Sequence, residues 1–285
     1  MWPAADTTRI GRASLRQASV IDPAPRKPRT IAPRTSQART GNTRTIHRPS
    51  IQPVALSLKP SASNQLIPVH SIGSGFEDIT YDPRERRFYL IIEAEEDTDG
   101  QYRAFVVEYD QEFRFQRCTR LSTTFETRNK GFEGLAHLWR GEKEYLLALC
   151  EGNLCTAAKK GGGRVQVFER TEEKNWKWSH EVALPTAAEF EDYAAIKMHG
   201  SRIALVSQAS HRVWIGEVDR TAHAYVDDGV VYKFPNKSYC NAEGVAWLSD
   251  DHLVIVSDRM KARKQRKRCA EKDQSIHIFR IPDQE

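Results

Sequence analysis

The chain has 285 residues, enough for one large domain or two small ones. Its hydrophobic content of 39% is low for this length, which indicates that part of the chain stays outside any packed core. No apolar run is long enough for a signal-peptide core or a membrane helix, so we expect a soluble protein with no membrane partner.

Charge locates the unfolded part at the start of the chain. Residues 1–60 hold eleven Lys and Arg against two acids, a charge of +9, whereas the whole chain carries only +5. Residues 61–285 therefore carry −4. We predict that residues 1–62, rich in Pro, Ser, Thr and Arg, form a disordered basic tail of a cytoplasmic monomer. Two alternatives stay open: an organellar transit peptide over residues 1–60, and an arm that contacts nucleic acid weakly and nonspecifically.

Residues 63–285 contain a fourfold internal repeat. Each unit begins with Phe or Ala, then Glu, then Asp or Gly, and its first part covers 75–95, 131–153, 189–210 or 241–259. The shared glutamates, Glu77, Glu133, Glu191 and Glu243, are 56, 58 and 52 residues apart. Each first part reads as two apolar strands joined by a turn, and a third strand follows at 103–110, 164–170, 212–219 or 275–282. A fourth strand is visible in three units, at 113–121, 176–184 and 229–235.

Four antiparallel strands in a unit of roughly fifty residues are typical of a β-propeller blade. We therefore predict an all-β fold in which residues 63–285 form a propeller with four visible four-stranded blades. The fourth unit ends after its third strand, so an N-terminal strand at 66–72 is predicted to complete that blade and close the ring. Four is the lower limit of the expected range of roughly four to eight blades, which leaves open whether blades are missing relative to related proteins.

The recurring glutamates predict a charged site at one mouth of the central channel. The start of a first strand and the end of a second strand lie on the same face of a blade. Polar residues at the second-strand ends should therefore join the four glutamates, namely Glu93, Glu95, Glu151, Asn153, Gln208 and Asp258. Crowded carboxylates raise one another's pKa unless a cation neutralises them, and oxygen ligands select Ca²⁺ or Mg²⁺. Alternatively, each glutamate accepts backbone N–H groups from a neighbouring blade and has a purely structural role.

Two basic loops between second and third strands open on the same face. One contains Lys159 and Lys160, and the other spans 259–268, beginning with Arg259. With a cation, these loops can help the mouth to hold a phosphorylated or carboxylated ligand. The plainer interpretations of 259–268 are a solvated loop or a nuclear-localisation patch. His211 follows the second strand of unit three and can reach the mouth, although a structural role is the better interpretation.

The five cysteines are an odd number at irregular spacing, and no secretory signal accompanies them. We therefore expect reduced thiols that serve in packing. Cys150 and Cys155 have no second pair that would complete a zinc site.

Two units carry a recognisable local motif. Glu243-Gly-Val-Ala-Trp247 and Phe132-Glu-Gly-Leu-Ala136 are each followed by a strand that ends in an acidic or amide residue. In this the chain resembles SdiA-regulated and phytase-like (esterase-like) propellers over roughly 66–285, and it is more distantly similar to gluconolactonase and senescence-marker propellers. The resemblance implies that Glu243 or Glu133 is a ligand of a divalent metal, with Asn153 and Asp258 as partners. The chain departs from the lactonases in its smaller number of blades and in having only Gly152-Asn153 in place of their Asn-Gly ligand pair.

The sequence thus favours a propeller that binds a ligand or a divalent cation, Ca²⁺ above all, at its glutamate-lined mouth. One alternative is a metal-dependent esterase or phosphatase, and another is a noncatalytic propeller that binds a protein on its loop face. No Gly-x-Ser-x-Gly motif is present, and no catalytic residue is assigned.

Overall fold

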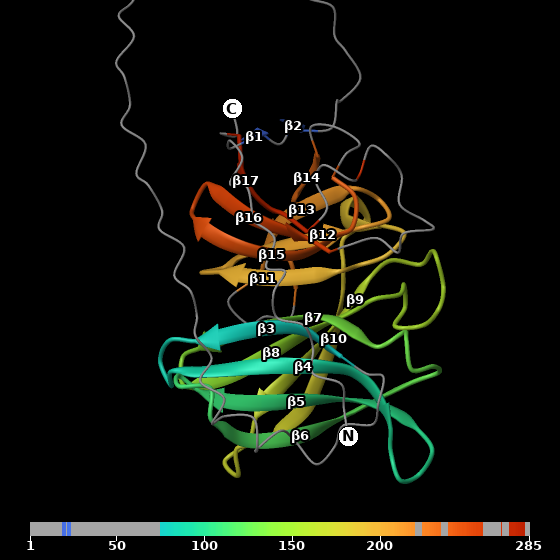
Figure 1. Cartoon of the computed structure of the whole chain (residues 1–285), viewed down its shortest axis with the longest axis vertical. Helices are drawn as coiled ribbons and strands as arrows, with labels where there is room; N and C mark the ends of the chain where they lie inside the picture. Colours follow the sequence, from blue (N-terminus) through green and yellow to red (C-terminus); the bar gives the residue numbers. More distant parts are fainter. Residues whose placement is uncertain are drawn as a thin grey trace, which may run out of the picture.

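The computed structural model describes residues 75–219, 224–234, 239–258, 269 and 274–282, together with the backbone of residues 19–20 and 22–23. These residues form four mainly antiparallel sheets arranged as a β-propeller (Figure 1). The predicted fold class is confirmed. Within the described part of the chain, no helix is long and apolar enough to cross a membrane.

Each unit of the repeat forms one blade, and the strands follow chain order from the channel outward. Blade 1 contains β3 (Phe76–Asp82), β4 (Arg87–Glu96), β5 (Tyr102–Asp110) and β6 (Phe115–Phe125). Blade 2 contains β7 (Phe132–Arg140), β8 (Lys143–Cys150), β9 (Arg164–Arg170) and β10 (Trp176–Ala183). Blade 3 contains β11 (Ala195–His199), β12 (Arg202–Ser207), β13 (Arg212–Glu217) and β14 (Val230–Lys233). Blade 4 contains β15 (Ala242–Ser249), β16 (His252–Ser257) and β17 (Ile276–Arg280).

Two short N-terminal strands extend blades 3 and 4. β1 (Ser19–Val20) pairs in parallel with β17 and gives blade 4 its fourth strand, whereas β2 (Asp22–Pro23) pairs with β14. A strand from the N-terminal part of the chain was predicted at this place, but at residues 66–72, which lie outside the described residues. The rest of the predicted tail, 1–62, also lies outside them.

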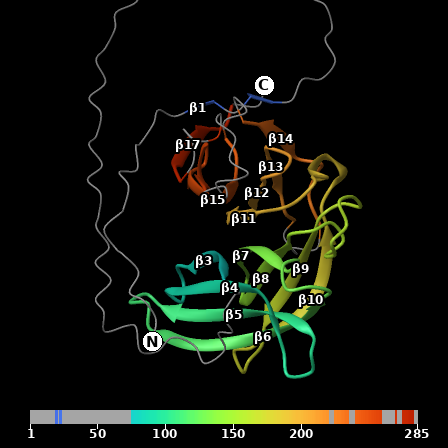
Figure 2. The ribbon, with the colours of Figure 1, turned by 45° about the vertical axis from the view of Figure 1, so that its right-hand side comes forward.

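Strand periodicity explains why the blades pack face to face. Successive side chains of a strand point to opposite faces of the sheet. In β8, Leu147 and Leu149 belong to the core shared with blade 3, whereas Leu146 and Ala148 belong to the core shared with blade 1. A third core joins blades 3 and 4 and contains Val206 and Leu253. Figure 2 shows the four sheets following one another around the ring from β3–β6 to β15–β17.

Blade 3 begins differently from the other blades. The 3₁₀ helix η2 (Thr186–Ala188) precedes it, and β11 starts only at Ala195. Glu191, predicted at the start of this strand, therefore lies in the loop before it.

The prediction of reduced cysteines is wrong for four of the five. Disulfides join Cys150 to Cys155 and Cys240 to Cys269, while Cys118 is a free, half-buried thiol. Sequence spacing did not show that the folded loops bring each pair within bonding distance.

Candidate functional site

Three glutamates meet at one end of blades 1 and 2. Glu93 lies near the end of β4, Glu133 near the start of β7, and Glu151 directly after β8. One carboxylate oxygen of each lies within 4.8 Å of the other two, a spacing at which a single metal ion can contact all three. We call Glu93, Glu133 and Glu151 the mouth cluster.

The pKa shifts connect the mouth cluster with the other predicted glutamates. Burial raises the pKa of Glu133 to about 9, and the charges of Glu77, Glu151, Glu93 and Glu243 add to the shift. The pKa of Glu93 rises to about 7 through burial, although an N–H group of Gly131 partly opposes the shift. Burial, together with Glu151, also raises the pKa of Glu77. Glu77 and Glu243 are thus near enough to Glu133 for their charges to raise its pKa.

Backbone geometry fixes two members of the cluster. The N–H of Gly131 donates to Glu93 Oε1 at 3.1 Å, and a Cβ at position 131 would lie only 2.3 Å from the Glu93 carbonyl oxygen. The N–H of Glu151 donates to the Gly131 carbonyl, and the Glu151 carbonyl accepts from the N–H of Tyr193, each at 3.0 Å. The cluster is thus built where three blades meet through main-chain hydrogen bonds.

Glu151 has one satisfied and one unsatisfied oxygen. Its Oε1 forms an ion pair with Lys130, whereas its Oε2 is buried and has no hydrogen-bond partner in the structure. A buried carboxylate oxygen without a donor is costly, and a bound cation would satisfy it.

A second acidic group faces the mouth from blades 3 and 4. Glu243 Oε1 accepts a hydrogen bond from Gln208 Nε2 at 2.6 Å, and the same amide donates to Asn241. Burial raises the pKa of Glu243 to about 7, with further contributions from Asp258 and Glu77. Gln208 and Asp258, both predicted on the sequence, therefore lie beside Glu243.

Asp192, rather than Glu191, faces this group from blade 3. Glu191 is exposed, and its N–H donates to Ser210 Oγ at 2.9 Å. The carboxylate of Asp192 accepts from Ser207 Oγ at 2.7 Å and contributes to the raised pKa of Glu243. Sequence reasoning missed Asp192 because the repeat alignment assumed that all first strands begin at the same position.

Several other predicted residues are occupied by internal contacts. Asn153 is fully buried, donates to the Phe190 carbonyl at 3.1 Å and accepts from the Tyr193 hydroxyl at 3.4 Å. Glu95, also buried, accepts from Arg128 at 3.1 Å. These contacts join blades and neighbouring loops, so both residues have an evident structural role.

The remaining predicted residues lie on the loops. Lys159 and Lys160 are exposed in the loop between β8 and β9. His211 lies in the turn after β12 with a φ of 53°, and its buried Nδ1 has no hydrogen-bond partner in the structure. Arg259 lies outside the described residues.

An ion pair on the inner strands borders the mouth. Lys197 of β11 binds the carboxylate of Asp78 on β3 and donates to the carbonyls of Leu135 and Ile196 at 3.0 and 3.1 Å. Asp78 Oδ2 also accepts from the N–H of Leu135 at 2.7 Å. This ion pair holds blades 1, 2 and 3 together beside the channel.

Another buried group, Asp82, His137 and Glu144, has ligand spacing but is already satisfied. Its oxygens and ring nitrogen lie within 4.8 Å of one another. Asp82 accepts from the N–H of Arg84, from the N–H of Glu85 and from Trp139 Nε1 at 2.9, 3.0 and 3.0 Å. Glu144 accepts from the Tyr89 hydroxyl at 2.6 Å. We interpret this group as a structural network between blades 1 and 2.

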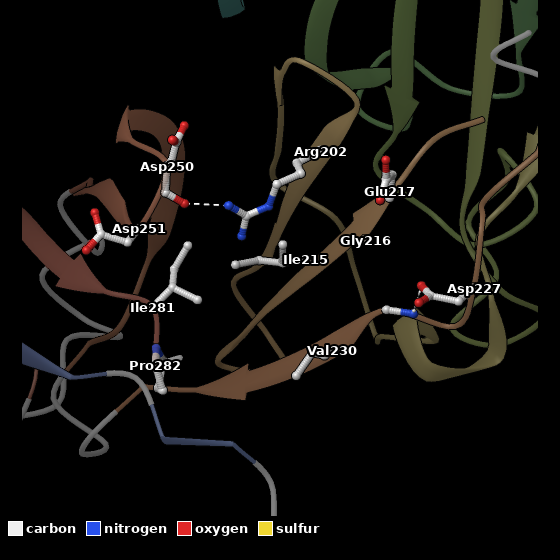
Figure 3. Close-up of a pocket in the computed structure, with 11 residues that line it drawn as sticks. Arg202, Ile215, Gly216, Glu217, Asp227, Val230, Asp250, Asp251, Ile281 and Pro282 are labelled. Carbon is white, nitrogen blue, oxygen red and sulfur yellow. Dashed lines mark hydrogen bonds between the residues drawn. The ribbon is translucent and has the colours of Figure 1, made fainter. Parts of the chain in front are cut away.

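A cavity of about 340 Å³ lies between blades 3 and 4, away from the mouth cluster. Figure 3 shows Arg202 pointing across it, with its guanidinium donating to the Asp250 carbonyl. Two carboxylates that line this cavity already have partners within the protein. Glu217 accepts a hydrogen bond from Ser201 Oγ at 2.6 Å, and Asp250 Oδ1 is hydrogen-bonded to His199 Nε2 at 2.6 Å. The mouth cluster therefore remains the stronger candidate.

Comparison with known proteins gives similar folds at low identity. No protein-family model matches the sequence, and no curated protein matches it. Among solved structures, the chain is similar to a luciferin-regenerating enzyme with 12% identity and a TM-score of 0.45, over 73% of this chain and 62% of that one. It is also similar to the periplasmic gluconolactonase of Pseudomonas aeruginosa, with 9% identity and a TM-score of 0.40, over 73% and 58%. A third is the PQQ-bound aldose sugar dehydrogenase of Streptomyces coelicolor, with 11% identity and a TM-score of 0.36, over 73% and 81%.

The chain thus spans about three fifths of the length of the first two structures. At these identities and TM-scores we draw no inference about activity from the likeness. The assignment of the fold rests on the strand order and registers described above. The resemblance to SdiA-regulated and phytase-like propellers stays a prediction.

Proposed function

We propose that this propeller binds a divalent cation, with Ca²⁺ preferred, at the mouth cluster. The observation that supports this proposal most directly is that Glu93, Glu133 and Glu151 place carboxylate oxygens within 4.8 Å of one another. The raised pKa of Glu133 and the unpartnered Oε2 of Glu151 support this proposal, since a cation would offset the repulsion and satisfy the oxygen. Carboxylate oxygens are the ligands that hard cations such as Ca²⁺ and Mg²⁺ take in proteins.

The cation and its surroundings would together form a ligand site. Glu77 and Glu243 lie close enough to influence the charge of Glu133, and Lys130 is paired with Glu151. A bound cation would lower the pKa of Glu133 and offer its remaining coordination positions to a ligand at the mouth. A small molecule with carboxylate or phosphate oxygens fits such a centre, and the exposed Lys159 and Lys160 are candidates for further contacts.

Calorimetric titration of the purified full chain with CaCl₂ after chelator treatment tests the cation site. We expect one cation per chain, and Glu133→Gln should weaken binding at least about tenfold because one charged ligand is lost. Glu172→Gln is the matched control, since Glu172 is an exposed acid in a turn of blade 2. Absence of Ca²⁺ and Mg²⁺ binding by the wild-type chain would leave a noncatalytic propeller that binds a protein on its loop face.

A metal-dependent esterase or phosphatase is the second candidate, and His211 favours it. Its buried Nδ1 has no hydrogen-bond partner, and its backbone N–H donates to the carbonyl of Gln208, whose side chain binds Glu243. We expect hydrolysis of p-nitrophenyl phosphate or acetate that depends on Ca²⁺ and is lost in His211→Gln. If Ca²⁺ binds but neither ester is cleaved, ligand binding remains the proposed function and these ester classes are excluded.

A further inference from the structure

The two end blades each present an apolar sheet face that lies outside the blade-to-blade cores. In the described part of the chain, three cores join blades 1 and 2, 2 and 3, and 3 and 4. Inner-strand packing follows the same order, from β3 to β7, β11 and β15. These cores leave one face of blade 1 and one face of blade 4 at the two ends of the series, as Figure 2 shows for their sheets.

The face of blade 4 is apolar across three strands. Strand register aligns Ala246 with Val254 and Ile278, and Val256 with Ile276. Exposed fractions on this face include 59% for Leu248, 41% for Val256 and 44% for Ile276. The opposite face of the same strands carries Leu253 and Phe279, which are fully buried against blade 3.

The face of blade 1 is apolar in the same manner. Its rows align Ile79 with Leu90 and Val107, and Tyr81 with Phe88 and Tyr109. Ile79 and Tyr81 are 41% and 42% exposed, whereas Val107 is fully buried in a small cluster with Ile92 and Phe105 of the same sheet.

Equivalent positions of the repeat show that the exposed face of blade 1 is of the kind that packs on a preceding blade, and the exposed face of blade 4 of the kind that packs on a following blade. The residue two positions after the repeat glutamate faces the preceding blade, and it is buried in blade 2 (Leu135) and blade 4 (Val245). Ile79 holds that position in blade 1 but is exposed. The next residue faces the following blade: Ala136 is buried against blade 3, whereas Ala246 of blade 4 is exposed. The faces thus continue the established blade-to-blade interfaces, one from each side.

We propose that two copies of this chain join head to tail, with the exposed face of blade 4 of each copy packed on the exposed face of blade 1 of the other. A second copy is the occupant that fits, because its blade 1 presents the face that would follow blade 4 of the first copy, and its blade 4 presents the face that would precede blade 1. From strand spacing and strand length, each sheet face has an area on the order of 300–400 Å². One joint alone therefore falls short of the ~800 Å² that each partner buries in a stable interface. Two joints per pair approach that area, and the resulting eight blades fall within the range of roughly four to eight.

Sedimentation velocity of the full chain across the micromolar range tests this proposal. We expect a species with twice the chain mass that dissociates on dilution. A single-chain mass throughout would overturn the proposal, as would open polymers of many copies, because both exclude the closed pair.

Charge substitutions test the head-to-tail arrangement. Leu248→Lys on blade 4 and Ile79→Glu on blade 1 should each weaken pairing at least about tenfold, since each places a charge in both joints. An equimolar mixture of the two variants should recover pairs, because one joint is then wild-type and the other brings Lys and Glu together. The matched control is Val226→Lys, at a residue 60% exposed that lies on neither face, and it should pair as the wild type does.

Unchanged circular dichroism and melting of the isolated variants would show that each still folds, as expected for exposed positions. If Ile79→Glu pairs normally while Leu248→Lys does not, the contact joins like faces and the head-to-tail arrangement is wrong. If the mixture of folded variants stays monomeric, the proposed complementarity of the two faces is also wrong.

Discussion

Glu133 is the residue on which the charge of the mouth depends most. It lies among four other carboxylates, and its pKa is raised to about 9 by burial and by their charges. A buried acid in such a place favours its neutral form, so protonation and cation binding compete for the same oxygens.

The stability of the cation-free protein should therefore fall as the pH rises. The folded-state pKa values of Glu93 and Glu243 are raised from 4.5 to about 7, and that of Glu133 to about 9. The stabilisation from these raised pKa values is fully present below pH 4.5. The contributions of Glu93 and Glu243 are lost as the pH rises to about 7, and that of Glu133 is lost as the pH rises to about 9. We expect Glu133→Gln in EDTA to melt higher than the wild type at pH 8.5, by roughly 2–8 °C, and the difference to shrink towards pH 5.

Excess Ca²⁺ should reverse this order, because the cation stabilises only the chain that can bind it. Thermal melts at several pH values with EDTA or CaCl₂ provide the measurement. A wild-type melting temperature that rises with pH in EDTA would contradict the assigned burial of these carboxyls.

At the scale of elements, one disulfide lies at the start of the loop between β8 and β9, and another joins Cys240, just before β15, to Cys269, after β16. The Cys150–Cys155 bond spans five residues and lies beside Glu151, whereas Cys240–Cys269 spans 29 residues. A cross-link restricts the unfolded chain more when it closes a longer loop.

Removal of the longer bridge should therefore cost more stability. In the chain-entropy model, Cys240→Ala with Cys269→Ala loses roughly 3–4 kcal/mol, and Cys150→Ala with Cys155→Ala loses about 2 kcal/mol. Urea unfolding of both double variants and of the oxidised wild type gives the comparison. Thiol counting under denaturing conditions provides the control, since one free thiol, Cys118, is expected in the oxidised chain. Equal losses would show that native packing around the bridges outweighs loop length.

At the scale of the whole molecule, the ion pair between Lys197 and Asp78 connects three blades. It is a polar contact between the inner strands of blades 1 and 3, and both side chains are largely buried. Burial raises the pKa of Asp78, and the charge and hydrogen bond of Lys197 partly oppose that shift.

Lys197→Met should destabilise the chain by about 3–5 kcal/mol, because it leaves the buried Asp78 carboxylate without its cation. The double variant Asp78→Asn with Lys197→Met should recover a large part of this loss, since no uncompensated charge remains. Lys177→Met, on the outer strand of blade 2, is the exposed control and should change stability by less than about 0.5 kcal/mol. Chemical unfolding of the four chains measures these differences, and equal stability of Lys197→Met and wild type would refute the structural role.

The sequence alone determined the strands and the fourfold repeat, and from the repeat it predicted a glutamate-lined mouth. These features follow from local rules: alternation of side chains fixes which residues enter a core, and the repeat spacing fixes the blade. Tertiary structure decided the rest. It placed Asp192 where Glu191 was predicted, buried Asn153 in a structural contact and paired four cysteines. It also left Ile79 and Leu248 exposed at the two ends. The physical reason is that a contact between blades depends on where each strand begins and how the sheets curve around the ring, which local periodicity does not encode.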